Sequence, residues 1–314
     1  MKPITPFVHG LNDAAAQAWL AALRQAAPGL DIRFATEIAP AERDRVEVAI
    51  VANADPADLA AFPRLKWVQS LWAGVERILR DMPDDAVQIV RLVDPQLGET
   101  MAEAVLAWTL FLHRAMPVYG AQQARRVWQQ HDLPTAAERR IGVLGLGHLG
   151  QKSAERLVRN GFDVLGWSRT ARDVPGVTTF SGAEGLSRLA AQADIVVVLL
   201  PSTPLTRGLL DARFLAAMKP GASLINFARG DIVVRDDLLA ALESRHVDHA
   251  VLDVFTTEPL PADDPLWDHR QITVLPHISA PTNRRTASAV VADNIEAYFA
   301  TGRMPATVSR ETGY

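Results

Sequence analysis

Short apolar runs alternate with stretches of helical periodicity along the whole chain. Runs such as 141–144 and 194–200 are too short for a buried helix, and they predict buried strands. Between such runs, apolar residues recur at helical spacing, as in 149–158, where an Asn-Gly pair then ends the helix. This alternation predicts an α/β fold in which helices cover parallel sheets.

The same pattern assigns the individual elements. Strands are expected at 4–8, 46–51, 66–71, 88–92, 141–144, 163–167, 194–200, 223–227, 250–254 and 272–275. Helices are expected from Asn12 to Pro28-Gly29 and at 57–62, 149–160, 183–193, 214–218, 238–242 and 285–300. A long helix is predicted over 99–119, followed by a polar linker over 122–140 with Trp128 as its aromatic anchor.

Length and composition allow two domains of ordinary size. The chain has 314 residues, a net charge of −4 and no cysteine, so a disulfide framework and a thiolate nucleophile are excluded. The charge gives no reason to expect a nucleic acid or membrane partner, and no apolar run approaches the length that spans a bilayer. We expect a cytoplasmic protein. No histidine or carboxylate spacing predicts a metal site.

A glycine motif follows the strand expected at 141–144. Gly145, Gly147 and Gly150 have the spacing G-x-G-x-x-G, and a helix and the strand at 163–167 follow. In this context the motif indicates a dinucleotide site. Gly145 permits the tight turn, Gly147 the approach of the pyrophosphate, and Gly150 close packing of helix and strand.

Two further segments complete the predicted cofactor site. The N–H groups of His148 and Leu149 begin the helix and would face the phosphates. The segment from Leu200 and Pro201 to Thr206 forms a polar loop after the strand at 194–200, where an adenosine can lie.

The end of the second strand predicts which dinucleotide binds. An NAD site usually has an acidic residue there, but this strand ends in Ser168, Arg169 and Thr170, and Asp163 stands at its other end. Arg169 can form a fork to a 2′-phosphate, and the two hydroxyls can donate to it. We therefore predict NADP(H), with NAD(H) as the alternative if Arg169 is only a solvated loop charge.

A strand, a turn and a helix also meet near residue 72. The amides of Ala73, Gly74 and Val75 follow the strand expected at 66–71 and suit a substrate carboxylate, although an ordinary connection fits equally well. Trp72 would line the pocket wall or belong to the core.

Three strands of the second half end in polar residues without a packing role. Arg229 follows the strand at 223–227, Glu258 comes shortly after the next strand, and His277 follows the last. Ligands of open α/β sheets gather at the carboxyl ends of strands, so these side chains can converge. Taken singly, the arginine could be a surface ion pair and the histidine structural.

The motifs GLGHLG, NFARGD, LDVFTTEPLP and LPHISA, in this order, resemble the D-2-hydroxyacid dehydrogenase family. Within it the chain is most similar to glyoxylate/hydroxypyruvate reductases of the A type, through LWAGVE, WSRT, PLW at 265–267 and a C-terminal Gly-Tyr pair. The resemblance implies two Rossmann-like or flavodoxin-like domains with a cleft between them, and usually a homodimer. We expect a substrate-binding domain at 1–98 plus 286–314 and an NAD(P)-binding domain at 99–285.

The resemblance also implies roles for single residues. Arg229 would anchor the substrate, His277 would be the acid/base, and Glu258 its partner. Ala228 and Asp253 would lie near the cofactor, although Asp253 could equally cap local backbone.

Elementary chemistry agrees with these roles. Reduction of a 2-keto acid needs a cation for the carboxylate, a proton for the carbonyl oxygen and a hydride. Arg229 supplies a planar fork, and His277 changes charge near neutrality. A carboxylate on the other ring nitrogen, from Glu258, would favour the imidazolium form.

The predicted function is an NADPH-dependent reductase of small 2-keto acids, glyoxylate or hydroxypyruvate. One alternative is reduction of bulkier keto acids such as phenylpyruvates. Another is a dinucleotide-sensing module without catalysis, because fold does not fix function. The complete arginine, glutamate and histidine set argues against the sensor, since a sensor needs no proton donor.

Overall fold

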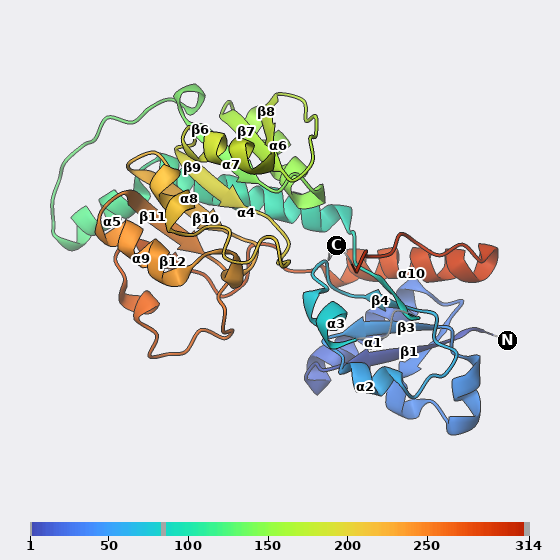
Figure 1. Ribbon diagram of the computed structural model, residues 1–314. Coiled ribbons are helices and arrows are strands. Elements are labelled where there is room, and N and C mark those ends of the chain that lie inside the picture. The colour runs from blue at the N-terminus through green and yellow to red at the C-terminus, as the bar shows by residue number, and fades with distance from the viewer. Residues whose placement is uncertain (1, 83–85, 311–314) are drawn as a thin grey trace. The chain divides into compact units, whose positions relative to one another are not determined.

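The computed structural model describes residues 2–82 and 86–310, and the chain divides into two compact units (Figure 1). Unit 1 comprises Met1–Gln96 and Thr282–Tyr314, and unit 2 comprises Leu97–Pro281. The division predicted from the sequence lies within a few residues of these bounds. The C-terminal Gly-Tyr pair of the resemblance lies outside the described residues.

Unit 1 is built on a parallel sheet of five strands in the order β2-β1-β3-β4-β5. Its central strand β3 is buried along its whole length, as the sequence VAIVA predicts. The strands are β1 (Ile4–His9), β2 (Asp31–Phe34), β3 (Val48–Ala52), β4 (Trp67–Ser70) and β5 (Gln88–Val90).

Helices cover the sheet of unit 1. One face packs against Trp19 and Leu23 of α1 and Val291 and Ile295 of α10, so segments from the two ends of the chain share a core. Asn12 caps α1 by accepting from the Ala15 amide at 2.9 Å, as predicted. The helices of unit 1 are α1 (Asp13–Ala26), α2 (Pro56–Leu59), α3 (Glu76–Asp81) and α10 (Arg284–Thr301).

Unit 2 is built on a parallel sheet of seven strands in the order β12-β11-β10-β9-β6-β7-β8. The order reverses between β6 and β9, which are neighbours. The strands are β6 (Arg140–Leu144), β7 (Asp163–Ser168), β8 (Val177–Ser181), β9 (Ile195–Val198), β10 (Ala222–Asn226), β11 (Val247–Leu252) and β12 (Ile272–Val274).

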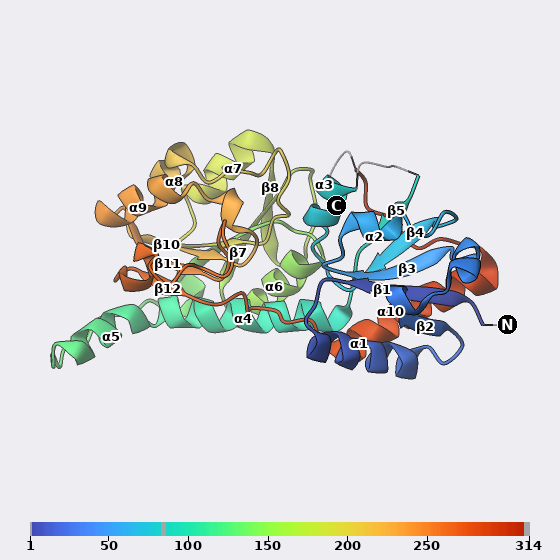
Figure 2. The same cartoon turned by 90° about the horizontal axis from the view of Figure 1, so that it is seen from below.

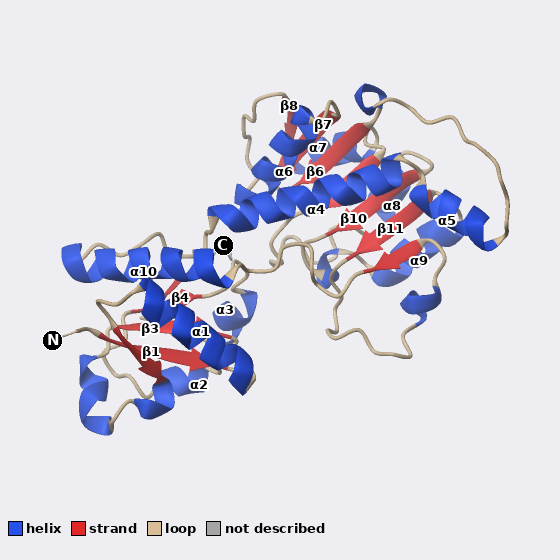
Figure 3. Cartoon of the chain, turned by 180° about the vertical axis from the view of Figure 1, so that it is seen from behind, coloured by secondary structure: helices blue, strands red, loops and turns tan. Residues whose placement is uncertain are grey.

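Two helical layers enclose this sheet. Buried residues of α4 and α6 form the core on one face, and those of α7, α8 and α9 form the core on the other. Figure 2 shows α4 along the first face, and Figure 3 shows helices on both sides of the strands. The helices are α4 (Pro95–His113), α5 (Met116–Ala124), α6 (His148–Arg159), α7 (Gly182–Ala190), α8 (Ala212–Ala217) and α9 (Arg235–Glu243). The predicted class, α/β with two parallel sheets, is confirmed.

The single helix expected over 99–119 is wrong. Ala115 has φ 51°, in the left-handed region, and it separates α4 from α5. Pro117 has no amide hydrogen and fits only the first turn of a helix, so it marks the start of α5. The apolar residues keep their helical spacing across this point, and spacing alone therefore does not reveal the break. The role expected for Trp128 is also wrong within this chain, because its side chain is 96% exposed and anchors nothing.

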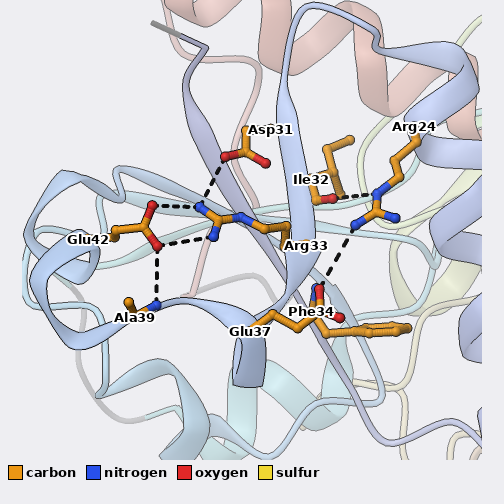
Figure 4. Close-up of polar contacts among 8 residues, drawn as sticks. All are labelled: Arg24, Asp31, Ile32, Arg33, Phe34, Glu37, Ala39 and Glu42. Atoms are coloured by element: carbon orange, nitrogen blue, oxygen red, sulfur yellow. Dashed lines mark hydrogen bonds and ion pairs between the residues drawn. The ribbon is translucent and has the colours of Figure 1, made fainter.

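The sequence pattern misses two of the four edge strands, β2 and β8. Both are half-exposed and polar, so they lack the continuous apolar run of a central strand. In β2 the side chain of Arg33 forms a fork to Glu42, with N–O distances of 2.9 and 3.0 Å, and lies 3.0 Å from Asp31 (Figure 4). The hydrogen bonds that the guanidinium donates to the Glu42 carboxylate lower the pKa of that carboxyl group.

Among residues 2–82 and 86–310, the structure contains no helix with both the length and the apolar character needed to cross a membrane.

Candidate active site

The predicted site residues of unit 2 follow the carboxyl ends of the strands of its sheet, which we call the sheet edge. Strands β10, β11 and β12 are adjacent and parallel, so the segments that follow them leave the sheet side by side. The segments after β6 and β9 leave the same edge, where the strand order reverses. Such a switch point is where open α/β sheets bind ligands.

The glycine turn after β6 is fixed by close backbone contacts. Gly145 has φ 102°, and a Cβ there would lie 2.7 Å from the carbonyl oxygen of Leu199. A Cβ on Gly150 would lie 1.7 Å from the carbonyl oxygen of Gly145. The first contact holds the turn against the segment after β9, and the second holds the start of α6 against the turn.

Gly147 differs from these two glycines because the space beside it is open. It precedes α6, and a Cβ there would meet no atom within 4 Å. The first amides of α6, at His148 and Leu149, have no partner within the helix and can bind an anion. The residues therefore fit a dinucleotide phosphate group. The His148 ring lies against α4, since its Nε2 would be 2.9 Å from a Cβ on Gly98 of that helix.

The turn after β7 holds the residues predicted to select the dinucleotide. Arg169 and Thr170 are exposed, while Ser168 is buried and its hydroxyl donates to the carbonyl of Thr170 at 2.7 Å. In this structure the Ser168 hydroxyl therefore stabilises the turn. Asp163, at the start of β7, pairs with Arg140 at 2.9 Å, far along the strand from the turn.

The loop after β9 is held by its own side chains. The Thr206 hydroxyl donates to the carbonyl of Pro201 at 2.6 Å and accepts from the Thr203 amide at 2.8 Å, and Leu200 is buried. The residues predicted to contact the cofactor here thus belong to one loop that is held by its own hydrogen bonds.

A contact that the sequence analysis missed ties this loop to the segment after β10. The Ser202 hydroxyl donates to Asp231 Oδ2 at 2.6 Å, and Arg207 Nε lies 3.2 Å from the same oxygen. The two partners are 29 residues apart, and no local motif signals the pair.

Arg229 follows β10 in a tightly held segment. The side-chain Nδ2 of Asn226 donates to the Arg229 carbonyl at 2.9 Å, and Asn226 Oδ1 accepts from the Ala228 backbone amide at 3.1 Å. A Cβ on Gly230 would lie 2.2 Å from the carbonyl carbon of Phe255. This backbone contact places the Arg229 segment directly against the segment that carries Glu258.

His277 and Glu258 form a hydrogen-bonded pair, with 2.7 Å between His277 Nδ1 and Glu258 Oε2. The other carboxylate oxygen accepts from the Phe255 amide at 2.8 Å, which fixes the orientation of the carboxylate. The His277 side chain is 52% exposed. Because Nδ1 binds the carboxylate, Nε2 is the nitrogen that can exchange a proton with a substrate.

Asp253 holds the backbone beside His277. It is 2% exposed, and its two oxygens accept from the amides of Ile278 and Ser279 at 2.7 and 2.9 Å. His277 itself has φ 54°, a left-handed conformation that costs energy for a residue with a Cβ. The structure thus gives Asp253 the backbone role that the sequence left open, and its contact with a cofactor stays a prediction.

In unit 1, the turn after β4 contains the predicted substrate-binding residues. Val75 is buried, while Ala73 and Gly74 are half-buried, and none of the three amides donates to another described residue. The Trp72 indole N–H donates to Asn53 Oδ1 at 3.0 Å. Sequence reasoning missed Asn53, which lies 19 residues away with no motif around it.

Comparison with known proteins identifies the family. Residues 106–279 match the NAD-binding domain of D-isomer specific 2-hydroxyacid dehydrogenases. A D-isomer specific 2-hydroxyacid dehydrogenase from Xanthobacter autotrophicus Py2, in complex with NADPH and MES, is 41% identical with a TM-score of 0.91, over 98% of this chain and 99% of that one.

Two other solved structures agree. The NADPH-dependent glyoxylate/hydroxypyruvate reductase of Sinorhizobium meliloti, in complex with NADP and sulfate, is 33% identical over 100% of both chains, with a TM-score of 0.89. A probable 2-hydroxyacid dehydrogenase of Rhizobium etli CFN 42, in complex with NADP, HEPES and L(+)-tartaric acid, is 31% identical over 100% of this chain and 99% of that one, with a TM-score of 0.90. The chain therefore belongs to the D-isomer specific 2-hydroxyacid dehydrogenase family and is an NAD(P)-dependent oxidoreductase.

Proposed function

We propose that this chain is an NADPH-dependent reductase of small 2-keto acids, converting glyoxylate to glycolate and hydroxypyruvate to D-glycerate. The observation that carries the proposal is the His277–Glu258 pair, oriented by the Phe255 amide and adjacent to the Arg229 segment. The name of the Sinorhizobium meliloti relative supports the choice of substrates.

The side chains of unit 2 supply what the reduction needs. The Arg229 guanidinium binds the substrate carboxylate and polarises the carbonyl group. His277 donates a proton from Nε2 to the carbonyl oxygen, and Glu258 stabilises the charge of the ring before the transfer. Bound NADPH supplies the hydride for the carbonyl carbon. The amides of Ala73 and Gly74 in unit 1 are proposed as further ligands of the carboxylate.

The cofactor is proposed to bind along the edge of the seven-stranded sheet. The open space beside Gly147 receives the pyrophosphate, and the amides of His148 and Leu149 bind it. The exposed Arg169 pairs with the 2′-phosphate. The NADP and NADPH in the structures of the relatives support this choice of dinucleotide.

The decisive experiment is an NADPH-oxidation assay on a panel of 2-keto acids, with NADH measured alongside. We expect the highest kcat/KM for glyoxylate and hydroxypyruvate. A higher kcat/KM for phenylpyruvate would assign the chain to bulkier keto acids. No turnover with any member of the panel, together with tight NADPH binding, would favour a sensor.

The NADP assignment has its own test in Arg169→Asp. The change removes the cation and installs an acceptor for a ribose 2′-OH, so the ratio of kcat/KM for NADPH to that for NADH should fall by about 100-fold or more, the value of a lost charge-assisted pair plus a new repulsion. Arg172→Asp is the control, because it places the same charge in the same exposed loop. An equal kcat/KM for both cofactors in the wild type would exclude Arg169 as the selecting residue.

We also propose that the active protein is a cytoplasmic homodimer. Large apolar side chains of α5 and the segment after it are exposed: Met116 by 44%, Val118 by 37%, Val127 by 43% and Trp128 by 96%. An apolar surface of this kind is typical of a protein interface, and a second copy is its proposed occupant. Light scattering should give twice the mass of 34.2 kDa, and Trp128→Asp should give the monomer.

A further inference from the structure

A strained residue ends the central strand of unit 1. Asn53 follows β3 and has φ 51°, in the left-handed region. Asparagine tolerates this region better than most residues, but glycine adopts it more readily. The conformation is held by close packing, because a Cβ on Gly10 would lie 2.5 Å from the carbonyl oxygen of Asn53, and the Gly10 amide donates to the Ala52 carbonyl at 2.9 Å.

This conformation directs the Asn53 side chain to Trp72, whose indole N–H donates to Asn53 Oδ1 at 3.0 Å. The main chain of Trp72 is held as well. Its amide donates to Ser70 Oγ at 3.0 Å, and its carbonyl accepts from the Leu92 amide at 2.9 Å. The ring packs edge-on against Trp19, with 5.7 Å between centroids. All the hydrogen-bonding groups of Trp72 are therefore engaged.

The backbone amides directly after Trp72 differ from those of Trp72 itself, because they make no hydrogen bond within the described residues. The amides of Ala73, Gly74 and Val75 donate to no described residue, although Trp72 before them is held at every polar group. A turn that presents unpartnered amides next to a fixed residue is ready to bind an anion without first paying the entropy of ordering.

From this arrangement we infer that Asn53 is a positioning residue for the substrate: through Trp72 it fixes the turn whose amides bind the carboxylate of the 2-keto acid. The inference rests on the proposed function, which supplies the carboxylate. Asn53 touches no reacting atom and acts only on binding. Its loss should therefore raise the KM for the keto acid and leave chemistry and the NADPH site unchanged.

The test uses four variants and one control variant of the whole chain, with glyoxylate and saturating NADPH. Asn53→Gly keeps the backbone conformation and removes the acceptor, and Trp72→Phe keeps the packed ring and removes the donor. The double variant closes a cycle between them. Asn53→Asp keeps an acceptor at the same distance. Asn12→Gly is the matched control, since it also removes an asparagine side chain of unit 1 that accepts a hydrogen bond, in this case from the Ala15 amide.

Asn53→Gly and Trp72→Phe should each raise the KM for glyoxylate about 3- to 10-fold, the range of one hydrogen bond at a partly exposed site. The kcat and the KM for NADPH should stay within about twofold. The double variant should match the single ones, because both remove the same bond. Asn12→Gly should behave as the wild type in kinetics and in hydrogen exchange. Asn53→Asp still accepts from the indole N–H, so its amides should exchange as in the wild type, while its added charge opposes the substrate carboxylate and raises the KM.

Hydrogen exchange gives a readout that does not depend on activity. Without the Asn53–Trp72 bond, the two hydrogen-bonded amides at this turn, those of Trp72 and Leu92, should exchange faster, while Asn12→Gly leaves them unchanged. If the wild type reduces no keto acid, the proposed function fails and this exchange still decides whether the bond fixes the turn. Unchanged exchange and KM in both single variants would overturn the inference, as would additive effects in the cycle or an Asn53→Asp variant whose amides exchange as fast as those of Asn53→Gly.

Discussion

The turn after β6 in unit 2 and the turn after β4 in unit 1 have the same plan, a strand, a short turn and a helix, but they are fixed differently. In the first, glycines allow backbone to pack on backbone, as Gly150 does against the carbonyl of Gly145. In the second, a side-chain bond from Trp72 reaches Asn53, the residue that follows the neighbouring strand β3.

The difference decides which site can be found in a sequence. Steric demands of a glycine turn fall on residues close together in the chain, so Gly145, Gly147 and Gly150 form a motif. A bond between Trp72 and Asn53 spans 19 residues and requires the sheet to bring β3 and β4 together first. Variants that remove one kind of contact at a time measure how much each contributes to stability and to binding.

The largest effect is expected from the glycines themselves. Gly150→Ala forces a Cβ into the Gly145 carbonyl, so it should destabilise unit 2 by about 3 kcal/mol or more. Gly147→Ala meets no protein atom within 4 Å, so its melting temperature should stay within about 2 °C, while the added methyl should weaken NADPH binding about tenfold or more. Calorimetry and NADPH titration measure both. A fall in melting temperature for Gly147→Ala would contradict the open space beside it.

The next effect concerns the strained backbone at the proton donor. Asp253→Asn keeps the shape but turns one acceptor of an amide into a donor, so the segment of Ile278 and Ser279 should loosen and kcat should fall about 10- to 100-fold, part of the general-acid contribution. Steady-state kinetics separate the two roles of Asp253. A rise in the KM for NADPH with normal kcat would indicate cofactor binding instead. Asp248→Asn, on the exposed side of β11, is the matched control.

Acid should lower the free energy of unfolding of unit 2 through protonation of His249 in the unfolded chain. Burial, with a smaller contribution from His269, lowers the pKa of His249 from 6.5 to about 4, and its Nε2 lies 2.9 Å from Thr273 Oγ1. Between pH 6.5 and pH 4, His249 binds a proton in the unfolded chain but stays neutral in the folded chain. The contribution of His249 to the free energy of unfolding should thus be constant above pH 6.5. Below pH 6.5 the free energy of unfolding should fall by about 1.4 kcal/mol per pH unit, a total loss of about 3 kcal/mol at pH 4.

Urea unfolding at several pH values checks this, and His249→Gln should flatten the curve between pH 6.5 and 4 because glutamine does not titrate. A variant with the slope of the wild type would show that other groups cause the acid sensitivity.

The smallest effect is expected at the edge of unit 1. Arg33→Met keeps the length of the side chain and removes the fork to Glu42 and the pair with Asp31 (Figure 4). Exposed pairs contribute little, so the melting temperature should fall by about 3 °C or less, and the difference should shrink in 1 M NaCl. A larger fall that salt leaves unchanged would mean that packing, rather than charge, is lost.

The predictability of the elements follows from the same distinction. Buried strands such as β3 and β9 are continuous apolar runs, so their position in the chain was predicted to within a few residues. Edge strands β2 and β8 are half-exposed, and only their pairing with β1 and β7 makes them strands. The break at Ala115 has a signal in the sequence, Pro117, which fits only the first turn of a helix, but the apolar periodicity that runs past it predicted one continuous helix.

The candidate site divides in the same way. The pairing of His277 with Glu258 was predicted because each follows a strand in a readable motif, and the structure places their atoms 2.7 Å apart. The Ser202–Asp231 contact joins loops after β9 and β10. Such a contact can be predicted only once the order of the strands in the sheet is known, and no motif around either residue signals it.

The core shared by α1 and α10 sets the order in which the protein can be completed during synthesis. Unit 2 lies within one continuous stretch, Leu97–Pro281, and all of it leaves the ribosome before α10 does. The face of unit 1 that α10 covers with Val291 and Ile295 stays without its partner throughout that time. We expect the nascent N-terminal segment to be the part of the chain that chaperones bind, until the last helix closes the first unit made.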